Sequence, residues 1–411
     1  MSTPLLDEVG VELDAADLGP SVRVGVLRHT ASGVIGFDYD AGWLARPGAF
    51  VLDPAHGPYP GLQYPRSGEL AGILSDTAPD RWGRLLLERR ERADARAEGR
   101  RPRALREWDV LLGVSDTSRM GALRLVAPDG SFLAADADGV PPLSRLRELE
   151  AAARGVEAID GDDAHAAAQL ALLLAPGSSL GGARPKSGFI DGSGALWLAK
   201  FPSRSDRHDV GVTEYVLGRL AERAGIVVPE QLLLRLSDEG RTFAARRFDR
   251  TAHGRRLYAS AMTLTAHRDH DGASWLDLAT AIEDWGAVGH IDEDLAALFR
   301  RAAFGILVAH RDDHLRNHGF LRSAAGWRLA PAFDLTPLPD KSEHALTLDG
   351  SDATGSLDVL LSTTAFYRLS ERDARSIVDE VTDVVAGWRD VAAEAGVDDA
   401  TAAVLEAAIP A

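Results

Sequence analysis

The sequence predicts an α+β fold with two lobes, because strand patterns dominate its first part and helix patterns its second. Short runs of alternating apolar and polar residues, the period of half-buried strands, recur before residue 250. After residue 258 the apolar residues recur at helical spacing instead. The clearest helical stripe consists of Leu295, Leu298, Phe299, Ala302, Ala303, Ile306 and Leu307. Strands followed by helices in one chain are typical of the α+β class.

Residues 1–155 are predicted to form an N-terminal subdomain built on a small sheet. Residues 22–26 carry valine at every second position, and residues 36–40 have the composition of another strand. Residues 80–92 have apolar positions at helical spacing and predict a helix. The arginine-rich residues 89–106 are expected to form an exposed helix end and loop rather than a nucleic-acid site, since acidic residues alternate with the arginines. Two further elements, a strand over residues 121–126 and a helix over 142–154, complete this subdomain.

Residues 156–250 are predicted to form the core of the first lobe. Residues 187–190 and 195–201 alternate as two strands, and Asp191–Gly194 between them is a strong hairpin signal. The preceding segment, Gly177–Lys186, is rich in glycine and serine and predicts a loop.

An amphipathic helix follows the hairpin over residues 212–224, and Gly225 is expected to end it. Residues 232–236 and 242–248 predict two more strands. Residues 251–411 are assigned to a helical second lobe.

The composition is that of a globular protein and excludes several kinds of site. The chain has 411 residues, too many for one ordinary core, so several domains are expected. Its net charge of −17 disfavours direct binding of nucleic acid by the bulk surface. The absence of cysteine excludes disulfides, thiolate nucleophiles and cysteine–zinc sites. Because the start lacks a signal-like segment and no apolar run reaches the ~20 residues of a membrane span, a cytoplasmic protein without a membrane partner is expected.

One octapeptide predicts the chemistry. His310–Asn317 reads H-R-D-x-x-x-x-N, the spacing of a protein-kinase catalytic loop, and Asp334 follows after a short hairpin. Phosphoryl transfer needs a group that orients the attacking hydroxyl and oxygen ligands for magnesium on the nucleotide phosphates. Asp312 is therefore predicted to be the catalytic base, and Asn317 and Asp334 the Mg²⁺ ligands. The fold is accordingly predicted to be protein-kinase-like.

A cation for the phosphates of ATP is predicted at Lys200. The alternation of its strand places Lys200 on the face of Leu196 and Leu198, where an unpaired lysine is costly. Glu214, on the following helix, is the expected partner, as in the Lys–Glu pair of kinases. The Gly177–Lys186 loop is expected to cradle phosphates with its backbone N–H groups, although it lacks the Gly-Lys-Ser/Thr ending of a Walker loop.

Simpler structural roles compete for some of these residues. Aspartate often caps a helix or turn; the fit of the whole octapeptide favours catalysis for Asp312, whereas Asp313 is assigned the capping role. His310, His314 and His318 lie close together, but no cysteine or carboxylate set completes a zinc site. His310 and His314 are instead expected to orient the loop by hydrogen bonds.

Together with their flanks, these residues resemble the HipA-type serine/threonine kinase toxins of bacterial type II toxin–antitoxin modules. The resemblance spans nearly the whole chain, and the order of the motifs carries it. In chain order the segments are Phe37–Tyr39, Ala78–Gly83, Gly121–Leu123, Ser179–Lys186, Leu196–Pro202, Arg247–Arg250, Asp312–Phe320 and Pro331–Leu335.

The resemblance implies a kinase-like fold with an enlarged first lobe, and ATP and Mg²⁺ as cofactors. It implies ATP contacts at Ser179, Gly181, Gly182, Lys186, Lys200, Arg246, Phe248 and His314. Its catalytic set is Asp312, Lys200, Glu214 and Asn317. It also implies autophosphorylation of Ser179, with Ser178 as the second choice, which ejects the loop and switches the kinase off.

The partners implied by the resemblance are proteins. They are a hydroxyl-bearing substrate, in some members an aminoacyl-tRNA synthetase, and a small helix-turn-helix antitoxin that binds operator DNA. The chain itself would then meet DNA only through the antitoxin.

Two other functions stay open from the sequence. A small-molecule phosphotransferase of the aminoglycoside-kinase type carries a similar H-x-D-x-x-x-x-N loop, although the N-terminal motifs argue against it. A non-catalytic nucleotide-binding co-regulator would be expected to have lost part of the catalytic set, and all of its members are present.

Overall fold

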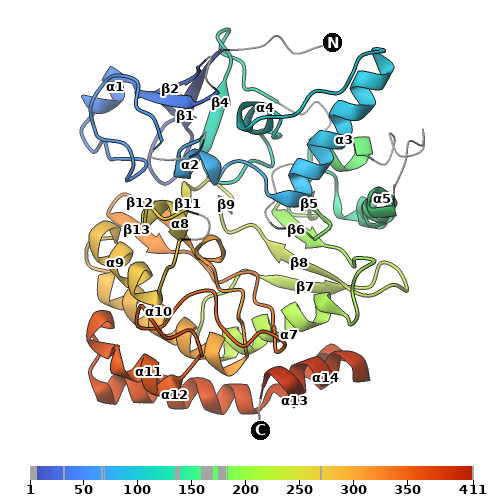
Figure 1. Ribbon diagram of the computed structural model, residues 1–411, viewed down its shortest axis with the longest axis vertical. Helices are drawn as coiled ribbons and strands as arrows, with labels where there is room; N and C mark the ends of the chain where they lie inside the picture. The colour runs from blue at the N-terminus through green and yellow to red at the C-terminus, as the bar shows by residue number, and fades with distance from the viewer. Residues whose placement is uncertain are drawn as a thin grey trace. The chain divides into compact units, whose positions relative to one another are not determined.

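The computed structural model describes residues 7–30, 33–65, 68, 70–134, 139–158, 170–174, 182, 184–268 and 271–409 (Figure 1). The chain divides into two compact units, Met1–Arg204 with Asp249–Tyr258, and Ser205–Phe248 with Ala259–Ala411. Small sheets and helices occur in both, so the predicted α+β class is confirmed. The three-domain division predicted from the sequence is finer than this one and stays a prediction.

The first unit contains a four-stranded antiparallel sheet in the order β3-β2-β1-β4. The strands are β1 (Glu8–Leu13), β2 (Val22–His29), β3 (Ile35–Tyr39) and β4 (Leu123–Val126). Strand β1 is central, and its side chains Val9, Val11 and Leu13 are buried. The strands expected near residues 22–26, 36–40 and 121–126 are confirmed, whereas β1 has no counterpart in the prediction.

Five α-helices and one 3₁₀ helix lie wholly within the described residues of this unit. They are α1 (Ala41–Leu44), α2 (Gly72–Ser75), α3 (Arg81–Ala97), α4 (Glu107–Leu112), η1 (Leu143–Arg145) and α5 (Leu146–Ala158). The arginines at the end of α3 and in the loop after it are paired inside the unit: Arg90 lies 3.5 Å from Asp94, and Arg103 binds Asp109 at 3.0 Å. These pairs support the assignment of residues 89–106 as a structural helix end and loop.

A β-hairpin follows, formed by β5 (Lys186–Ile190) and β6 (Leu196–Lys200) as predicted. Its turn is organised by Asp191, whose carboxylate accepts hydrogen bonds from Ser193 N at 2.8 Å and Trp197 Nε1 at 2.8 Å. The antiparallel register places Lys186 directly opposite Lys200. A second short hairpin, β9 (Arg250–Thr251) and β10 (Gly254–Arg255), also belongs to this unit.

The second unit begins with α7 (Val210–Arg223), which packs on the antiparallel pair β7 (Gln231–Leu234) and β8 (Thr242–Arg246). Asp209 caps α7 through Val212 N at 3.2 Å and also accepts from Arg241 N at 3.0 Å. This carboxylate therefore ties the start of the helix to the start of β8.

Helices dominate the remainder of the second unit. They are α8 (Ala261–Leu264), α9 (Trp275–Trp285), α10 (Ile291–Leu307), η2 (Leu315–Asn317), α11 (Leu357–Ser362), η3 (Thr364–Tyr367), α12 (Glu371–Ala386), α13 (Trp388–Ala395) and α14 (Asp399–Ala408). The strands are β11 (Tyr258–Ser260), β12 (Gly319–Ser323) and β13 (Gly326–Leu329).

Helix α10 is the centre of this unit, with α9 and α12 packed against it (Figure 1). Its buried face contains Leu295, Leu298, Phe299, Ala302 and Ala303, which confirms most of the predicted stripe. None of the helices in the described ranges combines the length and hydrophobicity needed to span a bilayer.

Candidate functional site

The predicted catalytic loop begins where α10 ends, in the second unit. Ala309 adopts a left-handed conformation (φ 49°), and His310 N donates to Gly305 O at 2.9 Å, so the chain leaves the helix in a tight turn. The side chain of Asn317 donates a 2.7 Å hydrogen bond to the carbonyl of Asp312. This bond closes the loop, and the amide oxygen of Asn317 is the type of hard ligand that Mg²⁺ prefers.

Asp312, the predicted base, lies at the surface beside a lysine. Its Oδ1 is 2.9 Å from Lys341 Nζ, and the two side chains are 46% and 51% exposed. The neighbouring Arg311 donates to the carbonyls of Leu338 at 3.3 Å and Pro339 at 3.0 Å, and also to the carbonyl of Lys341. Arg311 and Asp312 thus both bind the turn of residues 338–341: Arg311 binds its backbone carbonyls, and Asp312 binds the side chain of Lys341.

Asp313 has a different environment from its neighbour. Its side chain is fully buried and accepts hydrogen bonds from Ala345 N at 2.9 Å and Trp275 Nε1 at 3.2 Å, and its Oδ2 lies 3.3 Å from His344 Nδ1. Burial alone would raise the pKa of Asp313, but the hydrogen bond and charge of His344 lower the pKa below its usual value. The assignment of Asp313 as a helix or turn cap is wrong, because its partners come from two distant segments.

The three histidines of the loop differ in their contacts. His310 Nδ1 lies 2.9 Å from the carbonyl of Thr336, which confirms its predicted role in orienting the loop. His318 packs edge-on against Trp275, and burial lowers its pKa to about 3, so its ring is neutral near pH 7. His314 Nδ1 is buried and has no hydrogen-bond partner among the described residues, so the expected bond is not found for His314.

The segment that contains Asp334 is held from three sides. Ala332 N donates to Val227 O at 2.8 Å, Arg301 donates to Ala330 O, and the ring of Phe333 lies 5.5 Å from that of Phe248. Asp334 itself has φ 60°, a left-handed conformation that is uncommon for residues other than glycine. Such backbone strain persists only where the surroundings enforce it, and it is frequent at functional sites.

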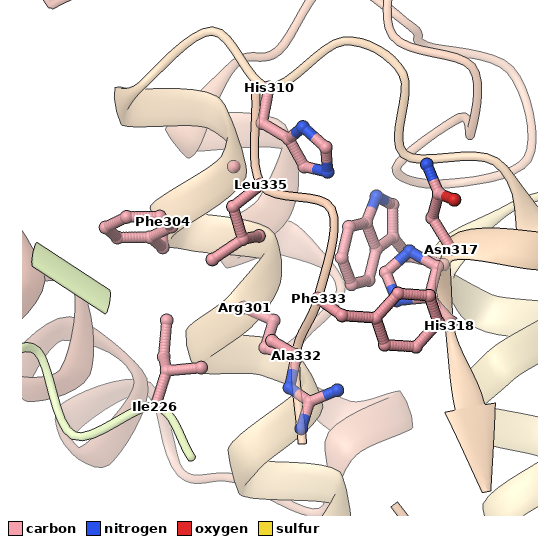
Figure 2. A pocket seen from close by; sticks show the side chains of 11 residues that line it. Ile226, Arg301, Phe304, His310, Asn317, His318, Ala332, Phe333 and Leu335 are labelled. Carbon is pink, nitrogen blue, oxygen red and sulfur yellow. The ribbon is translucent and has the colours of Figure 1, made fainter. Parts of the chain in front are cut away.

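A small pocket lies between α10, the catalytic loop and this segment (Figure 2). Its wall is mostly apolar, and His310, Asn317 and Phe333 reach it from the loop and the Asp334 segment. The remaining lining residues are Ile226, Trp275, Arg301, Phe304, Gly305, His318, Ala332 and Leu335. The pocket brings the two predicted catalytic segments to one place in the second unit. Among the described residues, no cluster of three or more His, Asp or Glu side chains could hold a metal ion.

The first unit contains the predicted phosphate cations. Lys186 and Lys200 are cross-strand neighbours and are only 4% and 8% exposed. Two like charges directly opposite each other on one sheet face are destabilising, and burial adds to that cost. Two buried ammonium groups on neighbouring strands are the kind of cation pair that binds an anion with several oxygens, such as a phosphate group.

The end of the glycine loop is held by α3 and its preceding residue. Asp80 Oδ2 accepts from Gly182 N at 2.9 Å, Trp82 N donates to Gly182 O at 3.1 Å, and Trp82 Nε1 donates to Lys186 O at 2.9 Å. Gly182 has φ 80°, and a Cβ there would lie 2.7 Å from Lys186 Nζ. Asp80 and Trp82 lie in the predicted helix over residues 80–92 and in the Ala78–Gly83 segment of the family resemblance, but the local pattern gave no sign of this role. Ser178, Ser179 and Gly181 lie outside the described residues.

The other predicted site residues are placed as follows. Glu214 is buried on α7, and Arg246 ends β8 with its amide donating to Glu230 O at 2.9 Å and its side chain exposed. Lys200 and Glu214 belong to different units, so their pairing stays a prediction. Lys341 was missed, because it stands in no motif.

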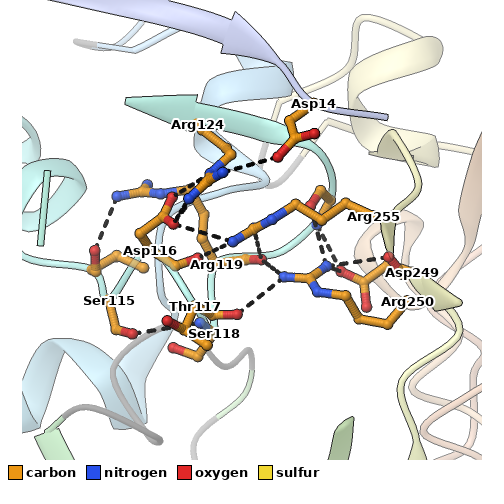
Figure 3. Close-up of polar contacts among 12 residues, drawn as sticks. Asp14, Ser115, Asp116, Thr117, Ser118, Arg119, Arg124, Asp249, Arg250 and Arg255 are labelled. Atoms are coloured by element: carbon orange, nitrogen blue, oxygen red, sulfur yellow. Dashed lines mark hydrogen bonds and ion pairs between the residues drawn. The ribbon is translucent and has the colours of Figure 1, made fainter. Parts of the chain in front are cut away.

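Asp249 and Arg250, from one motif of the family resemblance, form a polar cluster with residues 116–124 in the first unit (Figure 3). Arg250 donates to Asp249 Oδ2 at 2.6 Å and to the carbonyl of Arg119 at 2.7 Å. Arg255 donates to the carbonyl of Asp116 at 2.7 Å, and Arg124 binds the same aspartate through its side chain. The segment after β8 is therefore fixed to residues 116–124 of its own unit.

Two family models match the chain: the HipA N-terminal domain over residues 19–126 and the HipA-like C-terminal domain over residues 178–388. Among solved structures, the chain is similar to HipA of the Shewanella oneidensis MR-1 toxin–antitoxin system, solved with HipB and its operator DNA. The TM-score is 0.64 at 16% identity, over 96% of this chain and 94% of that one. The Helicobacter pylori proinflammatory kinase CtkA gives a TM-score of 0.35 at 15% identity, over 51% of this chain and 94% of that one.

A search of curated proteins gave no match. The similarity to the Shewanella structure confirms the predicted kinase-like, HipA-type fold. The two models together cover most of the chain, and the second alone covers more than half of it. The chain belongs to the HipA family.

Proposed function

We propose that the chain is an ATP- and Mg²⁺-dependent serine/threonine protein kinase that acts as the toxin of a type II toxin–antitoxin module. The observation that carries the proposal is the arrangement of two segments in the second unit. Asp312 is exposed in the catalytic loop, Asn317 is bound to the same loop, and Asp334 is held in a left-handed conformation in the segment after β13. Membership of the HipA family supports it. A non-catalytic regulator would have no need for this arrangement.

The residues present fit Mg-ATP. The buried cross-strand lysines, Lys186 and Lys200, would bind the nucleotide phosphates, and the unpartnered Nδ1 of His314 is a further polar atom for them. Asn317 and Asp334 would hold the metal through oxygen atoms. Bound ATP would supply the phosphoryl group, and bound Mg²⁺ would supply positive charge that neutralises the phosphates.

The chain's own residues would then have three roles. Asp312 would orient a serine or threonine hydroxyl and accept its proton, because its carboxylate is open to solvent. Glu214 would orient Lys200, and the backbone of Arg246 and Phe248 would receive the adenine.

The proposal extends to regulation and partners. Autophosphorylation of Ser179, or of Ser178, would act as the off-switch, and the substrate is a cellular protein, with aminoacyl-tRNA synthetases as the first class to test. A helix-turn-helix antitoxin would be the partner, and DNA would be met through it, in line with the HipA–HipB–operator complex of Shewanella. The aminoglycoside-kinase reading is disfavoured because both HipA domains match the chain.

Intact-mass spectrometry after incubation with Mg-ATP tests the activity. Wild type is expected to gain one phosphate, mapped to Ser179 or Ser178, and Asp312→Ala is expected to gain none. Asp340→Ala, an exposed aspartate in the turn next to the loop, is the matched control and should behave as wild type. No gain on wild type purified without phosphate, with ATP bound, would contradict the kinase assignment.

A further inference from the structure

Lysine is almost absent from this chain, and its positions are therefore informative. Of the 45 basic residues, only Lys186, Lys200 and Lys341 are lysines, and all others are arginines. Arginine makes surface ion pairs in both units, as in Arg90–Asp94 of the first unit and Arg389–Glu406 of the second. Lysine carries a compact, mobile ammonium and arginine a planar guanidinium, so the two differ in the charge contacts that they can make. Two of the three lysines, Lys186 and Lys200, are the proposed phosphate cations, and the third, Lys341, forms an ion pair with Asp312.

The position of Lys341 is fixed by the catalytic loop itself. Leu338 N donates to Ala309 O at 2.9 Å, and Lys341 N donates to Leu338 O at 3.2 Å, which forms a turn. Arg311 binds three carbonyls of that turn. The ammonium group then lies 2.9 Å from Asp312 Oδ1.

The Lys341–Asp312 pair contributes little to folding. Both side chains are about half exposed, and an ion pair in that setting adds little stability because solvent screens it. Its location is the informative part, because any hydroxyl that reaches Asp312 from solvent also meets the ammonium of Lys341. A phosphoryl group transferred from ATP to that hydroxyl would therefore lie next to a positive charge.

We propose that Lys341 is a further catalytic residue, which contacts the phosphoryl group during its transfer. This inference rests on the proposed kinase function. The substrate hydroxyl oxygen forms a bond to the terminal phosphorus, the bond from that phosphorus to the ADP oxygen breaks, and the hydroxyl proton passes to Asp312. Protonation removes the charge of Asp312, so the ammonium of Lys341 is released toward the equatorial oxygens, which carry the charge of the transition state.

Covalent labelling tests the position of Lys341 independently of turnover. The probe is an ATP acyl phosphate, which carries its reactive acyl group on the terminal phosphate and transfers it to a nearby amine. Mapping is simple because the chain offers three lysines and its N-terminus. Acylation of Lys341 in Mg²⁺, suppressed by excess ATP, is the expected result. Labelling of Lys186 or Lys200 alone, suppressed by ATP, would overturn the role of Lys341 while leaving nucleotide binding intact. If ATP suppresses labelling at no lysine, the proposed function fails, and this inference with it.

Kinetics supply the second test. Lys341→Ala is expected to slow phosphate incorporation by about 10²-fold with nucleotide affinity unchanged, as for loss of one preorganised charge contact. Lys341→Arg should restore part of that rate, because it keeps the charge in a less compact group. Asp340→Ala, in the same turn, is the control and should leave the rate unchanged. A rate for Lys341→Ala equal to or above wild type would show that the lysine is only a surface pair or a block on Asp312, and would overturn the proposal.

Discussion

The amide of Gly121 donates a 2.7 Å hydrogen bond to the carboxylate of Asp249, a residue 128 positions later in the chain and fully buried. The same carboxylate also accepts a hydrogen bond from the side chain of Arg250, so it binds both its own segment and the segment of Gly121. Gly121 has φ 75°, which most residues avoid, and its missing side chain leaves room for Tyr258, 3.3 Å from where a Cβ would lie. The G-A-L and R-F-D-R segments of the family are thus two halves of one structural contact within the first unit.

Asp249→Ala should destabilise the protein by about 3 kcal/mol, because it leaves the Gly121 amide and the Arg250 guanidinium without their shared acceptor. Urea unfolding monitored by circular dichroism measures the effect. The matched control is Asp238→Ala, whose side chain is 98% exposed and which should unfold as wild type does. Equal midpoints for the two variants would contradict the importance of this contact.

Asp312 and Asp313 are adjacent carboxylates with opposite expected phenotypes. Asp312→Ala should lower phosphoryl transfer by about 10²- to 10⁴-fold, the usual range for a general base, with little change in the thermal midpoint. Asp313→Ala should lower stability by about 3 kcal/mol, because it leaves the Trp275, His344 and Ala345 donors unpaired in the interior. Differential scanning fluorimetry and phosphate incorporation, measured on both variants, separate the two roles. A stable but inactive Asp313→Ala protein would reverse this assignment.

The lowered pKa of the buried His318 predicts that the free energy of unfolding depends on pH. Its folded pKa of about 3 lies well below the usual 6.5, so the unfolded state binds the extra proton between these values. Stability should therefore fall as pH drops below about 6.5, by about 1.4 kcal/mol per pH unit from this group alone. His318→Gln, which stays neutral and can still donate to the Asp313 carbonyl, should show a shallower slope than wild type in urea titrations at pH 7, 6 and 5. If the unfolding free energies of wild type and His318→Gln changed equally with pH, this histidine would not be the cause of the pH dependence.

The parts of the fold that the sequence predicted well are the ones set by local pattern. The hairpin around Asp191 follows from its turn residues, and the buried stripe of α10 follows from helical periodicity. Strand β1 was missed although Val9, Val11 and Leu13 alternate. It pairs with β2, the next strand, but its central place in the sheet also depends on pairing with β4, more than 100 residues later. Long-range pairing leaves little trace in a short window of sequence.

The candidate site shows the same limit. The spacing of the octapeptide identified Asp312 and Asn317, whose mutual contact is local. The role of Asp313 could not be predicted, because its donors Trp275 and His344 stand 38 and 31 residues away. Lys341 was missed for a similar reason, since only the folded turn brings it to Asp312.

Asp334 combines a backbone requirement with a proposed metal-ligand role, and one substitution can separate them. Asparagine tolerates the left-handed conformation that Asp334 adopts at φ 60°, so Asp334→Asn should keep the thermal midpoint of wild type. Its neutral amide is a weaker ligand for Mg²⁺ than a carboxylate, so the affinity for ATP in Mg²⁺ should fall by about tenfold or more. Calorimetric titration of ATP with Mg²⁺ and then with EDTA measures this. Wild type should lose affinity in EDTA, whereas the variant should change little, because the metal contact is already weakened. An equal loss for both proteins would show that Mg²⁺ is held without Asp334, and the metal would then have to be assigned to other oxygen ligands.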